Sequence, residues 1–448
     1  MEIVIKLSQF LLSLSLLIIL HELGHFIPAK LFKTRVEKFY LFFDVKFSLF
    51  KKKIGDTEYG IGWLPLGGYV KISGMVDESM DTEQLKQEPQ PWEFRSKPAW
   101  LRLIIMLGGV TVNFVLAFII YIGMTYHYGD LFIKNEDVAH GVWVVSKPLQ
   151  DAGLKTGDKI VSIDGKAIAN FNEVNESILL GKQVVVERDG NQIAIDLPVD
   201  LIDQIMQNKS NGLVGLRLPF VITDVVKESA NFEVFMPRDI VRNIGGEPIQ
   251  FVDQLEGILN AYKGQDVTFV VERDGQSKTV TATIDEEGKI GIAFAAMMPY
   301  DNLQKLGLYQ ISKHEYTLAE SIPVGFNKGI DKIVSYWKQL KMIFSPETGA
   351  YKGVGGFKAI FDIFPQFWSW EIFWSITAFL SIMLGVMNLL PIPALDGGHV
   401  MFLLYEIISG RKPSDKFLEN AQVVGFFILI GLLLFANGND IYKAIVGK

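Results

Sequence analysis

An apolar segment that ends in a metal-ligand motif constrains the fold of this chain most strongly. Between residues 3 and 20 only a lysine, a glutamine and three serines interrupt an apolar run that, with the following turns, can span a bilayer. The run continues into His21-Glu22-Leu23-Gly24-His25. Histidines four positions apart share a helix face and can bind one metal ion, and Glu22 is placed to act on a water there as general base. HExxH also occurs by chance, but ionisable groups are costly in hydrocarbon, so this context predicts an intramembrane metal site.

Composition indicates membrane spans combined with soluble modules. The chain has 448 residues, of which 49% are hydrophobic and 21% charged, and its mean hydropathy is +0.25. The net charge is −7 with no long basic run, so we expect no nucleic-acid partner. Cysteine is absent, which excludes thiolate ligands, cysteine nucleophiles and disulfides. Of the six histidines, only His21 and His25 have helical ligand spacing.

Three further apolar segments predict a four-span membrane protein. They cover residues 101–125, 370–390 and 423–435. Lysine and arginine crowd the loop between the first two spans, and the positive-inside rule places that loop in the cytoplasm. The chain after the second span then lies outside, and the two histidines lie towards the cytoplasmic side. The first span lacks a small-residue cleavage site, so we interpret it as retained rather than as a signal peptide.

A glycine-rich stretch between the first two spans cannot form a spanning helix. Residues 59–74 are apolar but contain repeated glycines and Pro65. Two interpretations remain open, a buried hairpin and a re-entrant loop. Non-helical backbone is tolerated at membrane depth only where protein or a water-filled cavity covers it.

An internal repeat indicates two copies of one small domain in residues 127–300. Each copy predicts strand, turn, strand, helix and strand in that order. The corresponding segments are 160–168 with 240–249, and 183–190 with 267–275. Residues 152–165 resemble a PDZ domain of the bacterial protease type, whereas residues 232–239 of the second copy depart from that pattern. PDZ grooves bind peptides as an added strand, and a packing or size-excluding module is the equal alternative.

An amphipathic helix is predicted before the third span, and it is expected to lie on the membrane surface. A second short helix is expected at residues 357–364. The apolar face of the first comprises Phe326, Ile330, Val334, Trp337 and Leu340, with lysines between them.

The third span carries the remaining candidate site residues. Catalytic zinc usually has three protein ligands and one open position, so two histidines are incomplete. Asp396, an isolated carboxylate just after a proline-broken span, is the preferred third ligand, and His399 is its rival. Asp396 can also be an ordinary turn residue. Asn388 is predicted to stabilise an oxyanion or hold the substrate backbone, unless it makes an interhelical hydrogen bond.

These motifs together resemble the site-2 protease family of intramembrane zinc metalloproteases, and within it the bacterial regulator-of-sigma-E type. The resemblance rests on HELGH ending the first span, on the motif at residues 388–399 and on tandem PDZ-like domains between them, and it covers nearly the whole chain. It implies zinc (Zn2+) held by His21, His25 and Asp396, with Glu22 as catalytic base. It also implies that Asn388 binds the substrate.

The family resemblance extends to the glycine-rich loop and the second span. The residues that match the family's re-entrant β-loop, thought to pair with unwound substrate, are Leu66, Gly67, Gly68, Tyr69 and Val70. Asn113 matches a second-span motif whose usual proline is here Val110. Where relatives often have Gly-x-Gly, this chain has Phe42-Phe43-Asp44, and no role is transferred to those residues.

We therefore expect a polytopic α-helical membrane protein with four transmembrane helices and a re-entrant β-loop, carrying two extracytoplasmic PDZ-like domains. The location implied is the bacterial inner membrane, with the PDZ-like domains in the periplasm. The expected regions are 1–126 for spans one and two, 127–218 and 219–300 for the PDZ-like domains, 301–367 for surface helices and 368–448 for spans three and four.

The expected function is an intramembrane zinc endopeptidase. The resemblance implies single-span transmembrane substrates such as anti-sigma factors, cut after a first extracytoplasmic cleavage, and remnant signal peptides. The alternative is a catalytically silent membrane adaptor that binds peptides through its PDZ-like domains, against which the intact Glu22 argues. A metal transporter is also conceivable, although one ionisable cluster among four spans makes a poor conduction path.

Overall fold

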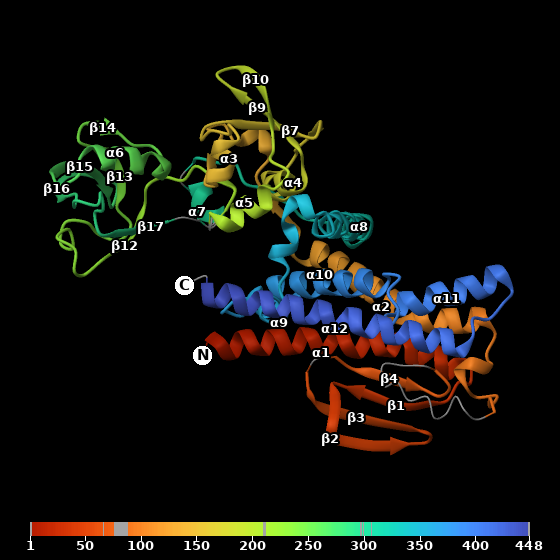
Figure 1. The fold of residues 1–448 in the computed structure, drawn as a ribbon. Helices are drawn as coiled ribbons and strands as arrows, with labels where there is room; N and C mark the ends of the chain where they lie inside the picture. The colour runs from red at the N-terminus through yellow and green to blue at the C-terminus, as the bar shows by residue number, and fades with distance from the viewer. Residues whose placement is uncertain are drawn as a thin grey trace. The chain divides into compact units, whose positions relative to one another are not determined.

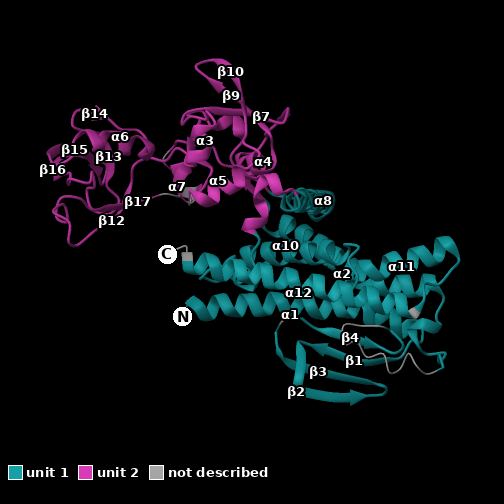
Figure 2. Cartoon of the chain, in the orientation of Figure 1, with its two compact units in different colours: residues 1–129, 315–344, 354–448 teal, residues 130–314, 345–353 magenta. Residues whose placement is uncertain are grey.

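The computed structural model describes residues 2–65, 67–75, 88–208, 212–295, 298, 300–305 and 307–446. Leu66 of the predicted loop lies outside these ranges. The chain divides into two compact units (Figure 2). Unit 1 comprises residues 1–129, 315–344 and 354–448, and unit 2 comprises residues 130–314 and 345–353.

Unit 1 is built on helices long and apolar enough to cross a membrane. Four such helices occur among the described residues: α1 (Glu2–Leu31), α2 (Ala99–Tyr128), α10 (Trp370–Asn388) and α12 (Asp415–Val446). At 1.5 Å per residue, α10 is about 28 Å long, close to a hydrocarbon core of roughly 30 Å, and α1, at about 45 Å, is longer than that core. The four predicted spans are present, and a membrane protein is the class that they define.

Helix α2 is central to unit 1, where it packs against α1, α10, α8 and α11. Small residues set the closest approach: a Cβ on Gly24 of α1 would lie 2.4 Å from the carbonyl oxygen of Gly108 in α2. Buried hydroxyls join the helices further along. Ser13 lies 2.9 Å from Thr377, and Ser381 donates to the backbone carbonyl of Asn113 at 2.8 Å. Such contacts are typical of helices packed in lipid, where apolar burial does not favour association.

A four-stranded sheet packs beside α1 (Figure 1). Its strands are β1 (Val36–Leu41), β2 (Phe43–Ile54), β3 (Thr57–Leu64) and β4 (Tyr69–Ile72). The order is β2-β3-β1-β4, with β1 parallel to β3 and antiparallel to β4. The predicted loop is thus part of a larger sheet that begins at Val36. Sequence reading missed β1 and β2 because their many lysines concealed the strand alternation.

Helix α11 (Asp396–Ser409) follows α10 as a separate element. Pro391 and Pro393 separate the two, since proline lacks the N–H that a continuous helix needs. Gly397 and Gly398 allow the first turn of α11 to lie against the backbone of residues 389–393, where a Cβ would come within 2.3–2.5 Å of carbonyl oxygens.

The predicted amphipathic helix is α8 (Leu318–Ile343), which begins at a Thr317–Glu320 capping box. It packs on α2 through small residues: a Cβ on Gly325 would lie 2.5 Å from Ile122. Most of its apolar stripe is exposed, Phe326 by 46% and Trp337 by 47%, whereas Leu340 at its end is buried. In Figure 1 α8 is seen end-on while α1 and α12 lie across the view, so α8 crosses their direction. A helix so oriented presents its stripe along a membrane plane.

The short helix α9 (Phe357–Asp362) lies at the end of unit 1 that holds both chain termini (Figure 1). Asp440 of α12 accepts hydrogen bonds from the backbone N–H of Gly356 and Ala359 at 2.9 and 3.3 Å. Lys6 of α1 pairs with Asp362 at 3.1 Å. Helix α9 therefore joins the first and last long helices.

Unit 2 contains two equivalent sets of strands. The sheet orders are β10-β9-β7-β8 and β16-β15-β13-β14, and the pairs β6–β11 and β12–β17 flank them. The first set is β6 (Val142–Val144), β7 (Lys159–Ile163), β8 (Lys166–Ala167), β9 (Gln183–Arg188), β10 (Asn191–Asp196) and β11 (Val214–Leu216), with α3 (Lys147–Asp151), α4 (Val174–Leu180) and α5 (Leu201–Gln207). The second is β12 (Ile222–Val225), β13 (Ile240–Ile244), β14 (Glu247–Pro248), β15 (Asp266–Arg273), β16 (Gln276–Thr283) and β17 (Ile292–Phe294), with α6 (Leu255–Ala261).

The two sets keep the same buried ion pair. Asp158, 1% exposed, pairs with Arg188 at 2.6 Å, and Asp239, also 1% exposed, pairs with Arg273 at 2.7 Å. The departure at residues 232–239 changes the backbone as well as the side chains, because residues 227–234 form turns where the first set has α3. Arg238, at φ 77°, nevertheless keeps the left-handed position that Gly157 holds at φ 98° in the first set. A non-glycine residue there costs on the order of 1–2 kcal/mol.

The segment just beyond the second set, up to residue 314, belongs to unit 2 rather than to surface helices. Helix α7 (Tyr300–Lys305) is followed by β18 (Ser312–His314), which pairs with β5 (Asp130–Phe132) where the chain enters the unit. Residues 345–353 return to α5, where Lys352 pairs with Asp203 at 2.6 Å. The predicted region 301–367 therefore divides between the two units. Its parts in unit 2 are held there by the pairing of β18 with β5 and by the contact of residues 345–353 with α5.

Candidate metal centre

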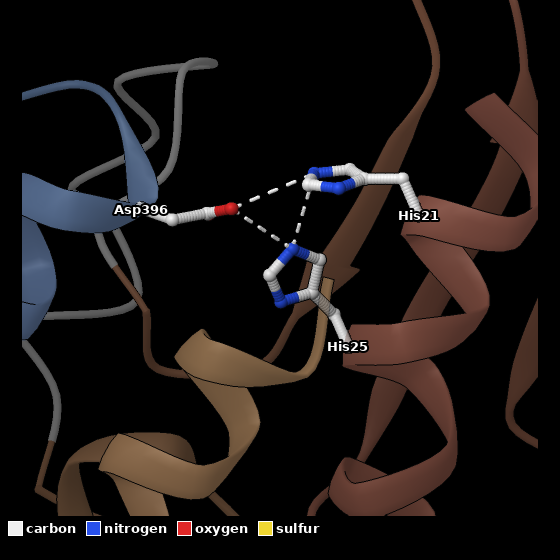
Figure 3. A group of neighbouring side chains, drawn as sticks. All are labelled: His21, His25 and Asp396. Atoms are coloured by element: carbon white, nitrogen blue, oxygen red, sulfur yellow. Dashed lines mark hydrogen bonds and ion pairs between the residues drawn. The ribbon is translucent and has the colours of Figure 1, made fainter. Parts of the chain in front are cut away.

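Helix α1 presents two imidazoles on one face (Figure 3). His21 Nε2 and His25 Nε2 are 3.4 Å apart, and both residues are buried. The four-residue spacing on a regular helix produces this geometry. Ligands about 2.0–2.1 Å from a tetrahedral zinc ion stand roughly 3.3 Å from one another, so the two nitrogens have the separation that one zinc ion requires.

Asp396 completes the triangle from the first turn of α11. Its Oδ2 lies 3.5 Å from His21 Nε2 and 3.3 Å from His25 Nε2. Among the described residues, these three side chains form the group of His, Asp or Glu whose ligand atoms could hold a metal ion.

The residues present fit zinc. Asp396 Oδ2 is buried and accepts no hydrogen bond in the described part of the chain, which is costly for a carboxylate oxygen unless it coordinates a cation. Gly109 of α2 leaves the space that the imidazoles occupy, because a Cβ there would lie 2.3 Å from His25 Nε2. Two imidazoles and a carboxylate are a donor set that zinc prefers.

Both imidazoles are oriented through their second ring nitrogen. The backbone carbonyl of Ile105 accepts from His25 Nδ1 at 2.8 Å, which leaves Nε2 as the free donor atom. Asn113 Nδ2 lies 3.0 Å from His21 Nδ1, while Asn113 Oδ1 is a buried acceptor without a partner. Exchanging the amide oxygen and nitrogen of Asn113 satisfies both groups and gives His21 the same tautomer. Sequence matching singled out Asn113 but assigned it no role.

Most of the other candidate residues line one cavity of about 560 Å³ with the three ligand-type side chains. Glu22 is partly buried on its wall. Asn388, the last residue of α10, places Nδ2 3.3 Å from His21 Nε2. His399 lines the cavity but stands outside the metal-ligand group.

The glycine-rich loop and β4 form another wall of this cavity, which includes Gly68, Tyr69 and Val70. Gly68 lies close to α1: a Cβ there would be 2.5 Å from Ile18 and 3.6 Å from Glu22 Cγ. Gly67 takes φ 154°, and its position faces the ring of Phe43 instead. Strand β4 is an edge of its sheet, so one row of its backbone groups is not paired within that sheet.

Sequence reasoning assigned no role to Phe43 and Asp44, yet both contact Tyr69. Phe43 and Tyr40 both stack with the Tyr69 ring, with centroids 6.1 and 5.4 Å away. Asp44 Oδ1 accepts from the Tyr69 hydroxyl at 2.8 Å, and burial together with this carboxylate raises the pKa of Tyr69 well above its usual range. The Phe42-Phe43-Asp44 departure thus marks the residues that hold β4 in place.

A metal-ligand triangle among apolar helices, beside an open strand edge, defines a membrane metallopeptidase class. The sequence matches Peptidase family M50 over residues 9–432. It is 28% identical to a Clostridium perfringens protein assigned by name to the zinc metalloproteases, covering 96% of this chain and 97% of that one. It is 26% identical to "Metalloprotease MmpA" of Caulobacter vibrioides (99% and 97%) and 25% identical to "Regulator of sigma E protease" of Haemophilus influenzae (98% and 99%).

The chain belongs to peptidase family M50, the site-2 proteases. It is a zinc metalloendopeptidase, and its cofactor is Zn2+. This membership favours the peptidase interpretation over the silent adaptor.

Proposed function

We propose that the protein hydrolyses peptide bonds of single-span transmembrane substrates at a zinc ion held by His21, His25 and Asp396. The observation that carries the proposal is the triangle of 3.3–3.5 Å between three buried donor atoms. It lies among helices long and apolar enough to cross a membrane. Soluble substrates would have no route to such a site, whereas a transmembrane segment can reach it laterally.

When bound, the zinc ion polarises the scissile carbonyl and activates water as the nucleophile. Glu22 accepts the proton of that water as general base and returns it to the leaving nitrogen. Asn388, next to His21, donates its amide N–H to the oxygen on which charge develops or to the substrate backbone. Glu22 is adjacent to His21 in sequence but does not belong to the metal-ligand group.

The edge of β4 would hold the substrate. A peptide bond within a helix is shielded by its own hydrogen bonds, so the substrate must unwind, and its freed backbone groups need partners in the absence of bulk water. Tyr69 and Val70 line the cavity with Glu22 and offer such partners on an open strand edge. Gly68 lets the chain pass close to α1. Gly67 and Leu66 belong to the same proposal.

The substrates we infer are transmembrane anti-sigma factors already cut outside the membrane, and remnant signal peptides. The relative named for sigma E regulation supports this class. The excess of lysine and arginine between α1 and α2 supports a bacterial inner-membrane orientation with the zinc site towards the cytoplasm. Unit 2 would then be periplasmic, and its two strand sets would be PDZ-like domains that exclude untrimmed substrates.

Substitution of Glu22 separates metal binding from chemistry. Purified Glu22→Gln should retain one zinc ion per chain and lose cleavage of a model transmembrane peptide, because a general base is not a ligand. Asp396→Asn should lose both zinc and activity, whereas His399→Ala should keep measurable activity. Loss of zinc from Glu22→Gln, or the reverse order for Asp396 and His399, would refute the assignment of roles.

A further inference from the structure

Helix α12 places a buried amide at the catalytic cavity. Gln422 is only 4% exposed and lines the same cavity as His21, Glu22 and Asp396. Its side chain has no hydrogen-bond partner within the described ranges. A glutamine in an apolar helix is costly unless its amide has polar surroundings, and Gln422 borders this cavity.

The packing of α12 explains why Gln422 points to the site. Gly425 brings the backbone of α12 against the loop before α11, where a Cβ would lie 1.7 Å from the carbonyl oxygen of Pro393. That loop ends at Asp396. Phe426 follows Gln422 by four positions, so both share a helix face, and both line the cavity. The register of α12 is thereby set against the segment that carries Asp396.

An amide side chain carries two N–H donors and one carbonyl acceptor, the same kinds of group that a peptide unit presents. The cavity wall at α12 is distinct from the wall formed by β4. We propose that Gln422 is a substrate-binding residue that hydrogen-bonds the backbone of the unwound substrate segment near the cleaved bond. The inference rests on the proposed function, to which it adds a second backbone partner for the substrate.

Kinetics of matched variants give the first test. Gln422→Met keeps the length of the side chain and removes its hydrogen bonds, so kcat/KM for a transmembrane peptide should fall about five- to tenfold with zinc content unchanged. Gln422→Glu keeps an acceptor only and should not restore the wild-type value. Asn420→Met removes an exposed amide from the same helix and should leave kcat/KM unchanged. Wild-type kcat/KM for Gln422→Met would overturn the proposal.

Crosslinking tests contact directly and does not depend on turnover. The chain contains no cysteine, so single cysteines can be placed at Gln422, at Asn420 and at Val70 in the Glu22→Gln protein. A transmembrane peptide with one cysteine, scanned through its apolar segment, serves as the probe under mild oxidation. Gln422→Cys should form disulfides with positions near the cleaved bond, and Asn420→Cys should form none.

The outcomes separate the two proposals. If wild-type protein cleaves the peptide and Gln422→Cys forms no disulfide at any position, the role of Gln422 is overturned, whatever Val70→Cys does. If Gln422→Cys forms the disulfide and Val70→Cys does not, the role of Gln422 stands and the pairing at β4 falls. If zinc-loaded wild-type protein cleaves no transmembrane peptide, the proposed function itself is refuted.

Discussion

Asn113 is the residue on which the orientation of His21 depends. It is fully buried, its side chain lies 3.0 Å from His21 Nδ1, and its backbone carbonyl is held separately by Ser381. The imidazole can offer Nε2 to a metal only if Nδ1 carries the proton and finds an acceptor. Asn113 Oδ1 has no hydrogen-bond partner among the described residues. Exchanging the amide oxygen and nitrogen of Asn113 brings this oxygen to His21 Nδ1, where it accepts that proton.

We therefore predict that Asn113→Leu weakens zinc binding about 10- to 100-fold. Competition with a chelator measures the affinity. Asn113→Asp, which keeps an acceptor, should remain close to the wild type. Equal zinc affinity in all three proteins would show that Ile105 and helix packing alone orient the two imidazoles.

At the scale of elements, β4 is the strand of the sheet that lines the cavity with the metal-ligand side chains. Its Tyr69 stacks with Tyr40 and with Phe43 and donates a hydrogen bond to Asp44. Consecutive residues of a strand direct their N–H groups to opposite sides. One of Tyr69 and Val70 therefore bonds towards β1, and the other directs its N–H to the open edge.

Proline substitutions at these two positions should have different effects. The variant that removes the open-edge N–H should lose cleavage of a transmembrane peptide while keeping zinc and thermal stability. The other should lower the unfolding temperature, because it removes a hydrogen bond of the sheet. Tyr69→Ala and Val70→Ala control for the lost side chains. Normal cleavage by both proline variants would mean that β4 only supports the site.

At the scale of the whole molecule, residues 130–314 of unit 2 begin and end at one place, and residues 345–353 rejoin the unit separately. Strands β5 and β18 pair antiparallel, with Phe132 opposite Ser312. Opposed residues in such a pair are about 5 Å apart, so a two-residue Asn-Gly turn can join them. Most of unit 2 can thus be removed without pulling apart α2 and α8.

Replacement of residues 133–311 by an Asn-Gly turn tests the excluding role proposed for unit 2. If unit 2 excludes bulky substrates, the shortened protein should cleave a substrate that still carries its outer domain. If unit 2 recruits, cleavage of trimmed substrate should fall, because tethering raises local concentration. Cleavage in cells of one substrate with and without its outer domain measures both. Normal cleavage of trimmed substrate alone would exclude both roles.

The segment 345–353 forms a strap on unit 2 that should release in acid. Lys352 lowers the pKa of Asp203 below its ordinary value of 3.8. The stabilising ion pair is therefore fully present above that value and is lost as the pH falls through the lowered pKa. A spin label at Glu347→Cys should be immobile near pH 7 and become mobile only below about pH 4. Adding Asp203→Asn should mobilise the label near pH 7, and release of the wild type at about pH 5 would contradict the assignment.

Local patterns were sufficient for the spans and for half of the candidate site. Four apolar runs predicted four long helices, and the spacing of His21 and His25 predicted two nitrogens on one face, because helix geometry alone determines both. The repeat likewise predicted equivalent strands in unit 2, since strand and turn signals are local. Resemblance to a family, rather than spacing, connected these parts to a peptidase.

The tertiary structure alone decided which distant residues meet. Asp396 reaches the histidines because two prolines end α10 and two glycines seat α11 on the loop between them. Phe43 and Asp44 meet Tyr69 because β1 and β4 pair, and Gln422 faces the cavity because Gly425 lies on Pro393. Most of the apolar stripe of α8 stays exposed because the small residues of the helix fit α2 more closely. Each of these contacts depends on the path of the backbone between residues far apart in the chain, which no local periodicity encodes.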